Sequence, residues 1–357
     1  MFRVDSSTLI GSGHLLRCLT LARAFRKEGA IVLFVCRNLN GNSIKQITDN
    51  RFKVEILSCD EVGIVSFKNQ TDYPSWLGVT LEKDAEQSKA ILSNYKPDLL
   101  VVDHYGLDSS WETKVMHLCK KLLVIDDLAN RHHVCDFLVD QNLGRLVSHY
   151  QNLVPRKCQI LVGPKYAMLR DEFIQHRNYS IRRRKNPKLK SILISMGGVD
   201  RLNTTRNVLF GLSDSKLTSK TSINIIMGDS APHTNDIINI SKSSRFKIEV
   251  LRNVNNMAKL LSTCDLAIGA GGSSTWERSC LGVPSIVVVT ADNQMMVALE
   301  VEKSGSGKAI LSIDSLSKKI KNTIDELIIP TDLEHMTEHA LKVTNGRGVN
   351  LVAGAVF

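Results

Sequence analysis

The sequence predicts an α/β protein made of two doubly wound domains that face a central cleft. Short apolar strand-like segments alternate with helix-like segments over residues 1–170, and the same alternation begins again at Ser191. Continuous apolar strands separated by helices are typical of parallel sheets covered on both faces. Residues 163–184, between the two sets, turn polar and basic. We therefore place the first domain at residues 1–170 and the second at 171–357.

The individual elements follow from local patterns. In the first half, the expected strands are Phe2–Val4, Ile31–Cys36, Val54–Leu57, Leu99–Val102, Leu122–Ile125 and Phe137–Val139, with helices at 15–29, 82–94 and 111–120. In the second half, the strands are the runs SILIS, INIIM, FKIEVL, LAIGA and SIVVV. Open α/β sheets bind ligands at the carboxyl ends of their strands, so we expect the functional residues there.

Composition narrows the class of protein. No apolar run approaches the roughly 18 residues of a membrane span, and the N-terminus lacks the apolar stretch of a secretory leader, so we expect a cytoplasmic protein. Aromatic residues make up only 5% and do not interleave with the basic runs, which disfavours nucleic acid. The basic run 182–185 is interpreted as a solvated linker or domain edge. The net charge of +10 suits an anionic small ligand.

The segment GAGGSSTWERSCLGVP, beginning at Gly269, predicts a strand, a glycine turn and a short helix. Ser273 and Ser274 are expected to cap that helix, whose amides, together with Gly272, would suit a phosphate. Glu277 in the first turn is placed to hold ribose hydroxyls. The alternative is an ordinary strand-to-helix turn, in which Glu277 only complements the helix dipole.

A second glycine turn, Gly11-Ser12-Gly13-His14, follows the first strand. It lacks the third glycine of a dinucleotide fingerprint, so a nicotinamide cofactor is disfavoured. His14 is the strongest candidate for a catalytic base, because an imidazole accepts a proton near neutral pH. Asp5 is expected to orient or neutralise it. The alternative for His14 is a capping or packing role.

Further candidates end other strands. They are Asp103, His104 and Tyr105, of which the aspartate could instead cap a helix; Gly198 and Asn203; and Asn293 and Gln294. Each could line a cleft or bind a sugar, although turns also favour such residues. No histidine or cysteine spacing supports a metal site, so we expect neither a metal nor a cofactor.

Six motifs in order carry a family resemblance: RVDSSTLIGSGHLLRCLTLA, VVDHYGLD, LVIDDLANRHHVCDFLVDQN, GPKYAMLRDEF, ISMGGVDRLNTT and GAGGSSTWERSCLGVPSIVVVTADNQ. Together they resemble the UDP-sugar hydrolases of pseudaminic acid biosynthesis, relatives of the MurG-type glycosyltransferases. The resemblance implies a GT-B fold, with UDP held mainly by the C-terminal domain. It also implies metal-independent hydrolysis of UDP-2,4-diacetamido-2,4,6-trideoxy-β-L-altropyranose, with inversion at the anomeric carbon.

The resemblance also implies roles for particular residues. His14 would activate water, Glu277 would bind the uridine ribose, Asn203 and Tyr105 would lie near the substrate, and backbone around Met257 would face uracil. Two alternatives stay open: a MurG-like glycosyltransferase that uses a UDP-sugar donor, and a catalytically silent UDP-sugar-binding protein. We expect a monomer without nucleic-acid partners or stable membrane association.

Overall fold

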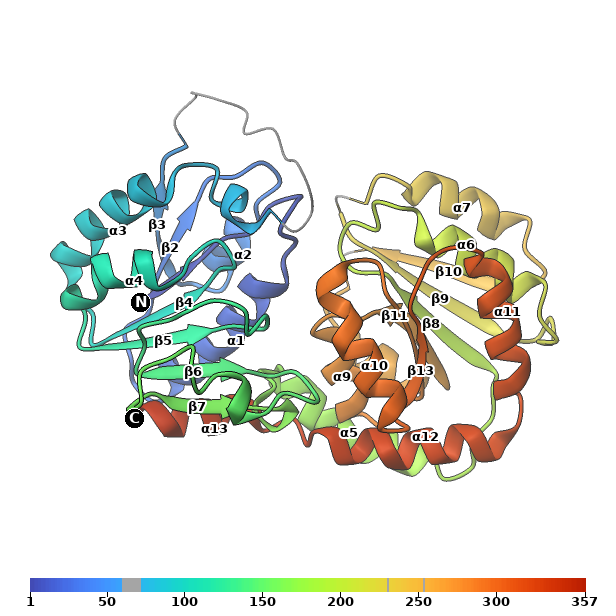
Figure 1. Ribbon diagram of the computed structural model, residues 1–357. Helices are drawn as coiled ribbons and strands as arrows, with labels where there is room; N and C mark the ends of the chain where they lie inside the picture. Colours follow the sequence, from blue (N-terminus) through green and yellow to red (C-terminus); the bar gives the residue numbers. More distant parts are fainter. Residues whose placement is uncertain (60–71, 230, 253) are drawn as a thin grey trace. The chain divides into compact units, whose positions relative to one another are not determined.

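The computed structural model describes residues 1–59, 72–229, 231–252 and 254–357 of the chain (Figure 1). These residues form two compact units. Unit 1 comprises Met1–Met168 together with Gly348–Phe357, and unit 2 comprises Leu169–Arg347. Within the described residues, each unit is built around one parallel sheet, of seven strands in unit 1 and six in unit 2.

The sheet of unit 1 has the order β3-β2-β1-β4-β5-β6-β7, with every neighbouring pair parallel. Its strands are β1 (Phe2–Val4), β2 (Leu33–Arg37), β3 (Lys53–Leu57), β4 (Leu99–Asp103), β5 (Lys121–Ile125), β6 (Phe137–Asp140) and β7 (Gln159–Val162). The strand order reverses between β1 and β4, which makes their carboxyl ends the topological switch point. Its α-helices are α1 (Gly13–Lys27), α2 (Ile44–Asp49), α3 (Leu81–Tyr95), α4 (Ser109–Val115) and α13 (Gly348–Val356).

Alternate residues of the central strands pack into two different cores. Val101 of β4 joins the core formed with α1 and α13, whereas Leu100 and Val102 join the core formed with α3 and α4. Both faces of the sheet are therefore covered, which explains why these strands are apolar throughout. Buried aliphatic strands of this kind were visible in the sequence as uninterrupted apolar runs.

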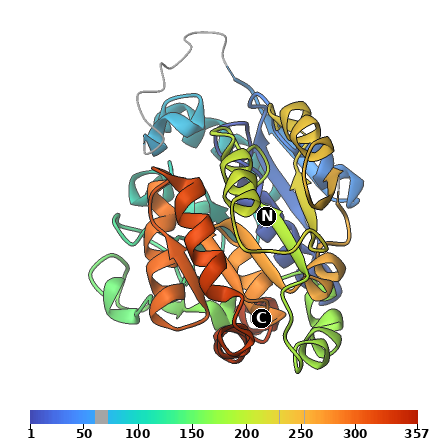
Figure 2. The ribbon, with the colours of Figure 1, turned by 90° about the vertical axis from the view of Figure 1, so that its right-hand side faces the viewer.

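Unit 2 repeats the same topology, with the order β10-β9-β8-β11-β12-β13 and its switch point between β8 and β11. Its strands are β8 (Ser191–Ser195), β9 (Ser222–Met227), β10 (Lys247–Arg252), β11 (Leu266–Ala270), β12 (Ser285–Val288) and β13 (Gly307–Ile310). Helices lie on both faces of this sheet (Figures 1 and 2). They are α5 (Asp171–Arg183), α6 (Thr204–Ser213), α7 (Thr234–Lys242), α8 (Met257–Thr263), α9 (Ser274–Cys280), α10 (Met295–Lys303), α11 (Leu316–Leu327) and α12 (Pro330–Val343).

The end of the chain corrects the expected division into domains. The sequence-based division assigned everything from residue 171 to residue 357 to the second domain, but α13 packs on α1 in unit 1. The rings of Phe25 and Phe357 meet edge to face at 5.2 Å. A Cβ at Gly348 would lie 2.4 Å from the carbonyl oxygen of Ala167, so glycine allows α13 to start against that backbone.

Two edge strands, β7 and β13, were not predicted. Each has four residues, and in β7 only Leu161 is buried. An edge strand is covered less completely than a central one, so its sequence lacks the continuous apolar run on which the other predictions depended.

Candidate functional site

The first candidate site lies at the switch point of unit 1, where a compact turn leads from β1 into α1. The hydroxyl of Ser7 accepts hydrogen bonds from the amides of Leu9 and Ile10, and the amide of Gly11 donates to the Ser7 carbonyl at 2.8 Å. Gly11 has φ +77°, a conformation that glycine adopts readily. This turn places His14 in the first turn of α1.

His14 is held by a carboxylate that lies 89 residues away in the sequence. Its Nδ1 lies 2.6 Å from Oδ1 of Asp103, the buried last residue of β4. An ionised carboxylate can only accept, so Nδ1 carries the proton and the lone pair of the neutral ring is on Nε2. The side chain is 10% exposed, and its hydrogen-bond contacts to Asp103 and Arg17 both lie on the Nδ1 side of the ring. The arrangement leaves Nε2 free to accept a proton.

Arg17 completes this pair from the next turn of α1. Its Nε and Nη2 donate to the two oxygens of Asp103, each at 2.6 Å, and its Nη1 donates to Asp127 at 2.5 Å. Burial by itself would raise the pKa of Asp103. The charge of Arg17 and the hydrogen bonds from Arg17 and His14 outweigh burial and hold that pKa well below its usual range. Asp103 is therefore a carboxylate at every physiological pH.

An aromatic cluster surrounds the imidazole. The Tyr105 ring meets His14 edge to face at 4.6 Å, and Trp76 lies 6.4 Å from His14. Tyr73 packs against both Trp76 and Tyr105. The Tyr105 hydroxyl donates to Asp127 at 2.9 Å, and burial together with the charge of Asp127 raises its pKa well above the usual value. Tyr105 therefore stays protonated and serves as a hydrogen-bond donor.

The structure corrects the role expected of Asp5. Its carboxylate pairs with Arg3 at 2.6 and 2.8 Å and accepts from the amide of Arg37 at 2.6 Å. His104 approaches it at 3.5 Å. Burial lowers the pKa of His104 to about 4, although the charge of Asp5 opposes this. Asp5 belongs to a buried network that joins β1 to β2, and the partner of His14 is Asp103. Sequence proximity pointed to the wrong carboxylate.

Asp103 was expected only as a strand-end residue that could line the cleft or cap a helix, and Arg17 and Trp76 were missed as site residues. The signal for Arg17 was modest, an arginine three residues after His14 on the same helix. Residues three apart on a helix share one face.

The second candidate site lies at the switch point of unit 2, beginning with the loop after β8. Asp200 and Asn203 both adopt left-handed backbone, with φ +44° and +50°. The Asp200 carboxylate accepts from the amides of Thr204 and Thr205 at the start of α6. Asn203 donates from Nδ2 to Asp236 at 2.7 Å, and its Oδ1 lacks a partner within the described chain. The Asp236 contact uses one N–H of this amide, so its second N–H and its buried Oδ1 are left without an assigned partner among the described residues.

Gly198 lies in the same loop, which packs closely on the neighbouring loop after β9. A Cβ at Gly228 would lie 2.0 Å from the carbonyl oxygen of Gly198. Only glycine at position 228 permits this approach. The close contact holds the exposed backbone of Gly198 at the carboxyl edge of the sheet.

The turn between β11 and α9 forms as predicted, but its serines behave differently. Ser273 occupies the N-cap position without a side-chain cap hydrogen bond. The Ser274 hydroxyl instead accepts from Arg278 at 3.3 Å. The serine caps expected from the sequence are therefore wrong, because Ser273 has helical backbone angles, with φ −56° and ψ −26°, in place of the extended angles of a capping residue. A Cβ at the exposed Gly272 would meet open space, so the backbone here is accessible to a ligand.

Glu277 lies on α9 beside two arginines. Arg170 approaches its Oε1 at 3.6 Å, and the carboxylate remains 21% exposed. Burial raises the pKa of Glu277, opposed by the charges of Arg170 and Arg278. Arg278 is buried and donates to the carbonyl of Ala270 at 3.1 Å, which ties α9 to the end of β11. Glu277 is thus held in place by its neighbours while part of its carboxylate faces solvent.

The remaining candidates of unit 2 share this edge of the sheet. Met257 begins α8 after β10, and Asn293 and Gln294 follow β12. Gln294 accepts from the amide and hydroxyl of Thr290 at 2.9 and 3.1 Å, so its side chain organises the turn. Asn293 is exposed. The sequence-predicted residues of unit 2 therefore all follow carboxyl ends of strands.

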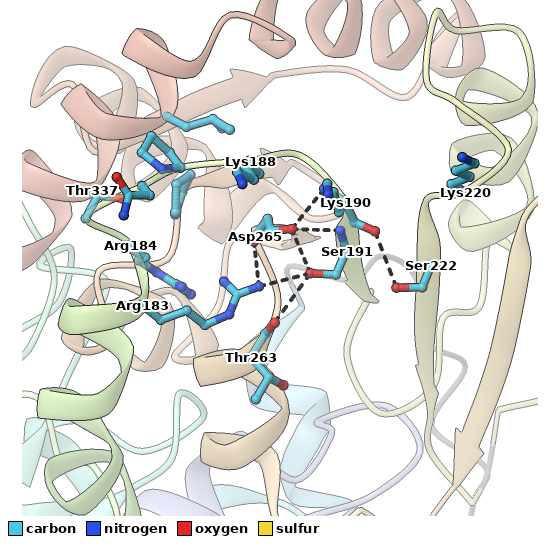
Figure 3. Close-up of a pocket in the computed structure, with 14 residues that line it drawn as sticks. Arg183, Arg184, Lys188, Lys190, Ser191, Lys220, Ser222, Thr263, Asp265 and Thr337 are labelled. Carbon is cyan, nitrogen blue, oxygen red and sulfur yellow. Dashed lines mark hydrogen bonds and ion pairs between the residues drawn. The ribbon is translucent and has the colours of Figure 1, made fainter.

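A basic pocket of about 580 Å³ lies at the opposite, amino-terminal edge of the unit 2 sheet (Figure 3). Arg183 pairs with Asp265 at 2.6 Å. Arg184 is 5% exposed and donates to the carbonyls of Gly282, Leu261 and Cys264. Residues 182–185 were interpreted as a solvated linker or domain edge. The solvated interpretation is wrong for Arg183 and Arg184, because both guanidinium groups donate to the carbonyl of Cys264.

The described residues contain neither a candidate metal site nor a helix that could span a membrane. No group of three or more histidine, cysteine, aspartate or glutamate side chains is placed to hold a metal ion there. None of the described helices is both long enough and apolar enough to span a bilayer.

The two parallel sheets and their strand order define a GT-B fold, and comparisons with known proteins agree. Residues 196–352 match the family model of the glycosyltransferase family 28 C-terminal domain. The crystal structure of MurG from Acinetobacter baumannii superposes with a TM-score of 0.71 at 15% identity, over 100% of this chain and 98% of that one.

Two relatives align over most of the chain. An uncharacterized protein of Methanocaldococcus jannaschii is 29% identical over 80% of the chain, which spans 54% of that relative's length. The UDP-2,4-diacetamido-2,4,6-trideoxy-β-L-altropyranose hydrolase of Campylobacter jejuni is 28% identical over 85% of the chain and 96% of its own length.

Proposed function

We propose that the protein hydrolyses UDP-2,4-diacetamido-2,4,6-trideoxy-β-L-altropyranose to UDP and 2,4-diacetamido-2,4,6-trideoxy-L-altrose without a metal ion. The observation that carries the proposal is the buried contact between His14 Nδ1 and Asp103, which leaves Nε2 as the basic nitrogen. The alignment with the Campylobacter jejuni hydrolase over 96% of that enzyme supports the choice of substrate.

In the proposed reaction, Nε2 of His14 removes a proton from water as the oxygen attacks the anomeric carbon. The bond between that carbon and the UDP oxygen breaks, and UDP leaves with the bonding electron pair. Attack opposite the leaving group inverts the anomeric centre. The imidazolium that forms is stabilised by Asp103, 2.6 Å from Nδ1, and a positioned base of this kind contributes about 10²- to 10⁴-fold to the rate.

Unit 2 is proposed to hold the nucleotide. Backbone amides at Gly272, Ser273 and Ser274 would bind the diphosphate and stabilise its charge as it leaves. Glu277 would accept hydrogen bonds from the ribose, and backbone near Met257 would face uracil. The remainder of the ligand is proposed to contact a set of strand-end residues in both units: Gly198, Asn203, Asn293 and Gln294 of unit 2, and Gly11, Ser12 and Gly13 of unit 1.

Product analysis tests the proposal directly. The purified protein is incubated with the UDP-sugar in H₂¹⁸O and EDTA, without any acceptor, and the products are followed by NMR and mass spectrometry. Hydrolysis by the proposed route yields UDP free of ¹⁸O, a free sugar carrying one ¹⁸O, and initially the inverted anomer. Label in UDP would contradict cleavage at the sugar carbon.

Two alternatives give different outcomes in the same assay. A glycosyltransferase is favoured by the family 28 match over residues 196–352, and it would remain inert until a sugar or lipid acceptor is added. A catalytically silent binding protein would bind UDP and the UDP-sugar without turning either over.

Replacing Glu277 by alanine should weaken UDP binding by about 10- to 100-fold, because hydrogen bonds to a charged group contribute about 1.5–3 kcal/mol. Isothermal titration calorimetry with UDP measures this. Glu334, exposed on α12, supplies the matched control, and Glu334→Ala should bind UDP like the parent. Equal affinities for Glu277→Ala and the parent would remove Glu277 from the nucleotide site.

A further inference from the structure

Arg17 takes no part in the proposed proton transfer, yet it contacts His14 and the carboxylates of both Asp103 and Asp127. Its side chain is 6% exposed and joins α1 to the carboxyl ends of two strands, through Asp103 after β4 and Asp127 after β5. We propose that Arg17 is a positioning residue that orients Asp103 and keeps His14 in its neutral, proton-accepting form. This inference rests on the proposed function of His14 as a base.

The geometry of the contact fixes the carboxylate. The guanidinium donates to both oxygens of Asp103, each at 2.6 Å, while His14 Nδ1 contacts the Oδ1 oxygen only. A bidentate arginine–carboxylate pair allows one orientation of the carboxylate plane. Asp103 can therefore not rotate away from the imidazole, and His14 keeps Nε2 as its free nitrogen.

The charges explain why an arginine is needed. Asp103 and Asp127 carry two negative charges, of which Arg17 neutralises one. Nη2 of Arg17 also lies 3.2 Å from Nδ1 of His14, where its positive charge opposes protonation of the ring. Without Arg17, two uncompensated carboxylates would favour the imidazolium, which cannot act as a base.

The other groups that face His14 do not supply this charge. Tyr105 is a neutral donor to Asp127, and the ring of Trp76 carries no charge. His104 is neutral because burial lowers its pKa to about 4, and the nearby Asp5 is paired with Arg3. Among the described residues, Arg17 is therefore the cation that contacts the His14–Asp103 pair.

The test follows the titration of His14 by NMR in protein labelled with ¹³C- and ¹⁵N-histidine, with the signal assigned by its loss in His14→Gln. Arg17→Met should move the midpoint upward by at least about one pH unit, since a charge a few ångströms away contributes that much or more. Asp127→Asn should move it downward. Arg17→Lys keeps the positive charge but loses the bidentate guanidinium, so the His14 midpoint in this variant should stay within about half a pH unit of the parent.

Turnover provides the second readout. In Arg17→Met, the apparent pKa on the acidic side of the kcat/KM pH profile should rise together with the NMR midpoint. Arg17→Lys should lose about tenfold in kcat, because its single ammonium cannot hold both oxygens of Asp103. The pH profile of Arg17→Lys should not shift. Arg26, exposed on the same helix, gives the matched control. Arg26→Met should behave like the parent in both measurements.

The outcomes separate this inference from the proposed function. A folded Arg17→Met whose His14 midpoint matches the parent overturns the role of Arg17. If Arg17→Met does not fold, the His14 titration in Asp127→Asn is the deciding measurement. A downward shift of the His14 midpoint supports the role of Arg17, and an unchanged or raised midpoint overturns it. The NMR titration needs no substrate, so failure to hydrolyse the UDP-sugar contradicts the proposed function and leaves this test intact.

Discussion

Replacing His14 by alanine lowers kcat with the UDP-sugar by about 10²- to 10⁴-fold, the range expected when a general base is removed. UDP affinity should stay within about twofold of the parent, because the proposed nucleotide contacts belong to unit 2. The measurement is steady-state release of UDP, together with calorimetric titration of UDP. The ring is only 10% exposed, so circular dichroism must first show that the variant is folded.

A matched histidine lies on the surface of the same unit. His117 is exposed in the short 3₁₀ helix Met116–Leu118, and His117→Ala should retain parental turnover and UDP affinity. If His14→Ala also kept parental kcat, a different group would be the base and the proposed mechanism would be wrong. A loss of UDP binding equal to the loss of kcat would instead indicate a structural role for His14.

Replacing Asp103 by asparagine is expected to lower kcat by about 10²-fold or more. The amide NH₂ of asparagine can donate to Nδ1, which would place the ring proton on Nε2 and leave no lone pair for water. The change also removes the bidentate partner of Arg17. Asp98→Asn is the matched control, because Asp98 is exposed and pairs only at the surface with Lys120. Parental kcat in Asp103→Asn would show that the tautomer of His14 is not set by Asp103.

The same variant tests the electrostatics of the pair. Breaking a buried ion pair costs about 3–5 kcal/mol of unfolding free energy at neutral pH. The pKa of Asp103 lies below its ordinary value in the folded protein. Its ionised form therefore stabilises the fold at neutral pH, and this contribution is lost as the pH falls towards the folded-state pKa. Urea unfolding should show a parent–variant difference that is constant above about pH 5 and shrinks below about pH 4.

The fold was largely predictable because its signals are local. Uninterrupted apolar runs such as Leu99–Val102 announce strands buried on both faces, and the turns before His14 and Glu277 are marked by glycines. Parallel pairing follows from the βα alternation, whereas the order of the strands in each sheet was not predicted. The same reasoning missed β7, whose partly exposed edge position removes the apolar signal.

Local sequence patterns were enough to predict the ends of the central strands, and therefore that His14, Tyr105, Asn203 and Glu277 follow carboxyl ends of strands. The pairing of the charged groups depends on how the strands are arranged in space. Asp5 is nine residues from His14, yet it pairs with Arg3, while Asp103 reaches the imidazole from 89 residues away. The physical reason is that β1 and β4 are neighbours in the sheet, and the charges buried at their ends must each find an opposite charge in space, whatever their separation along the chain.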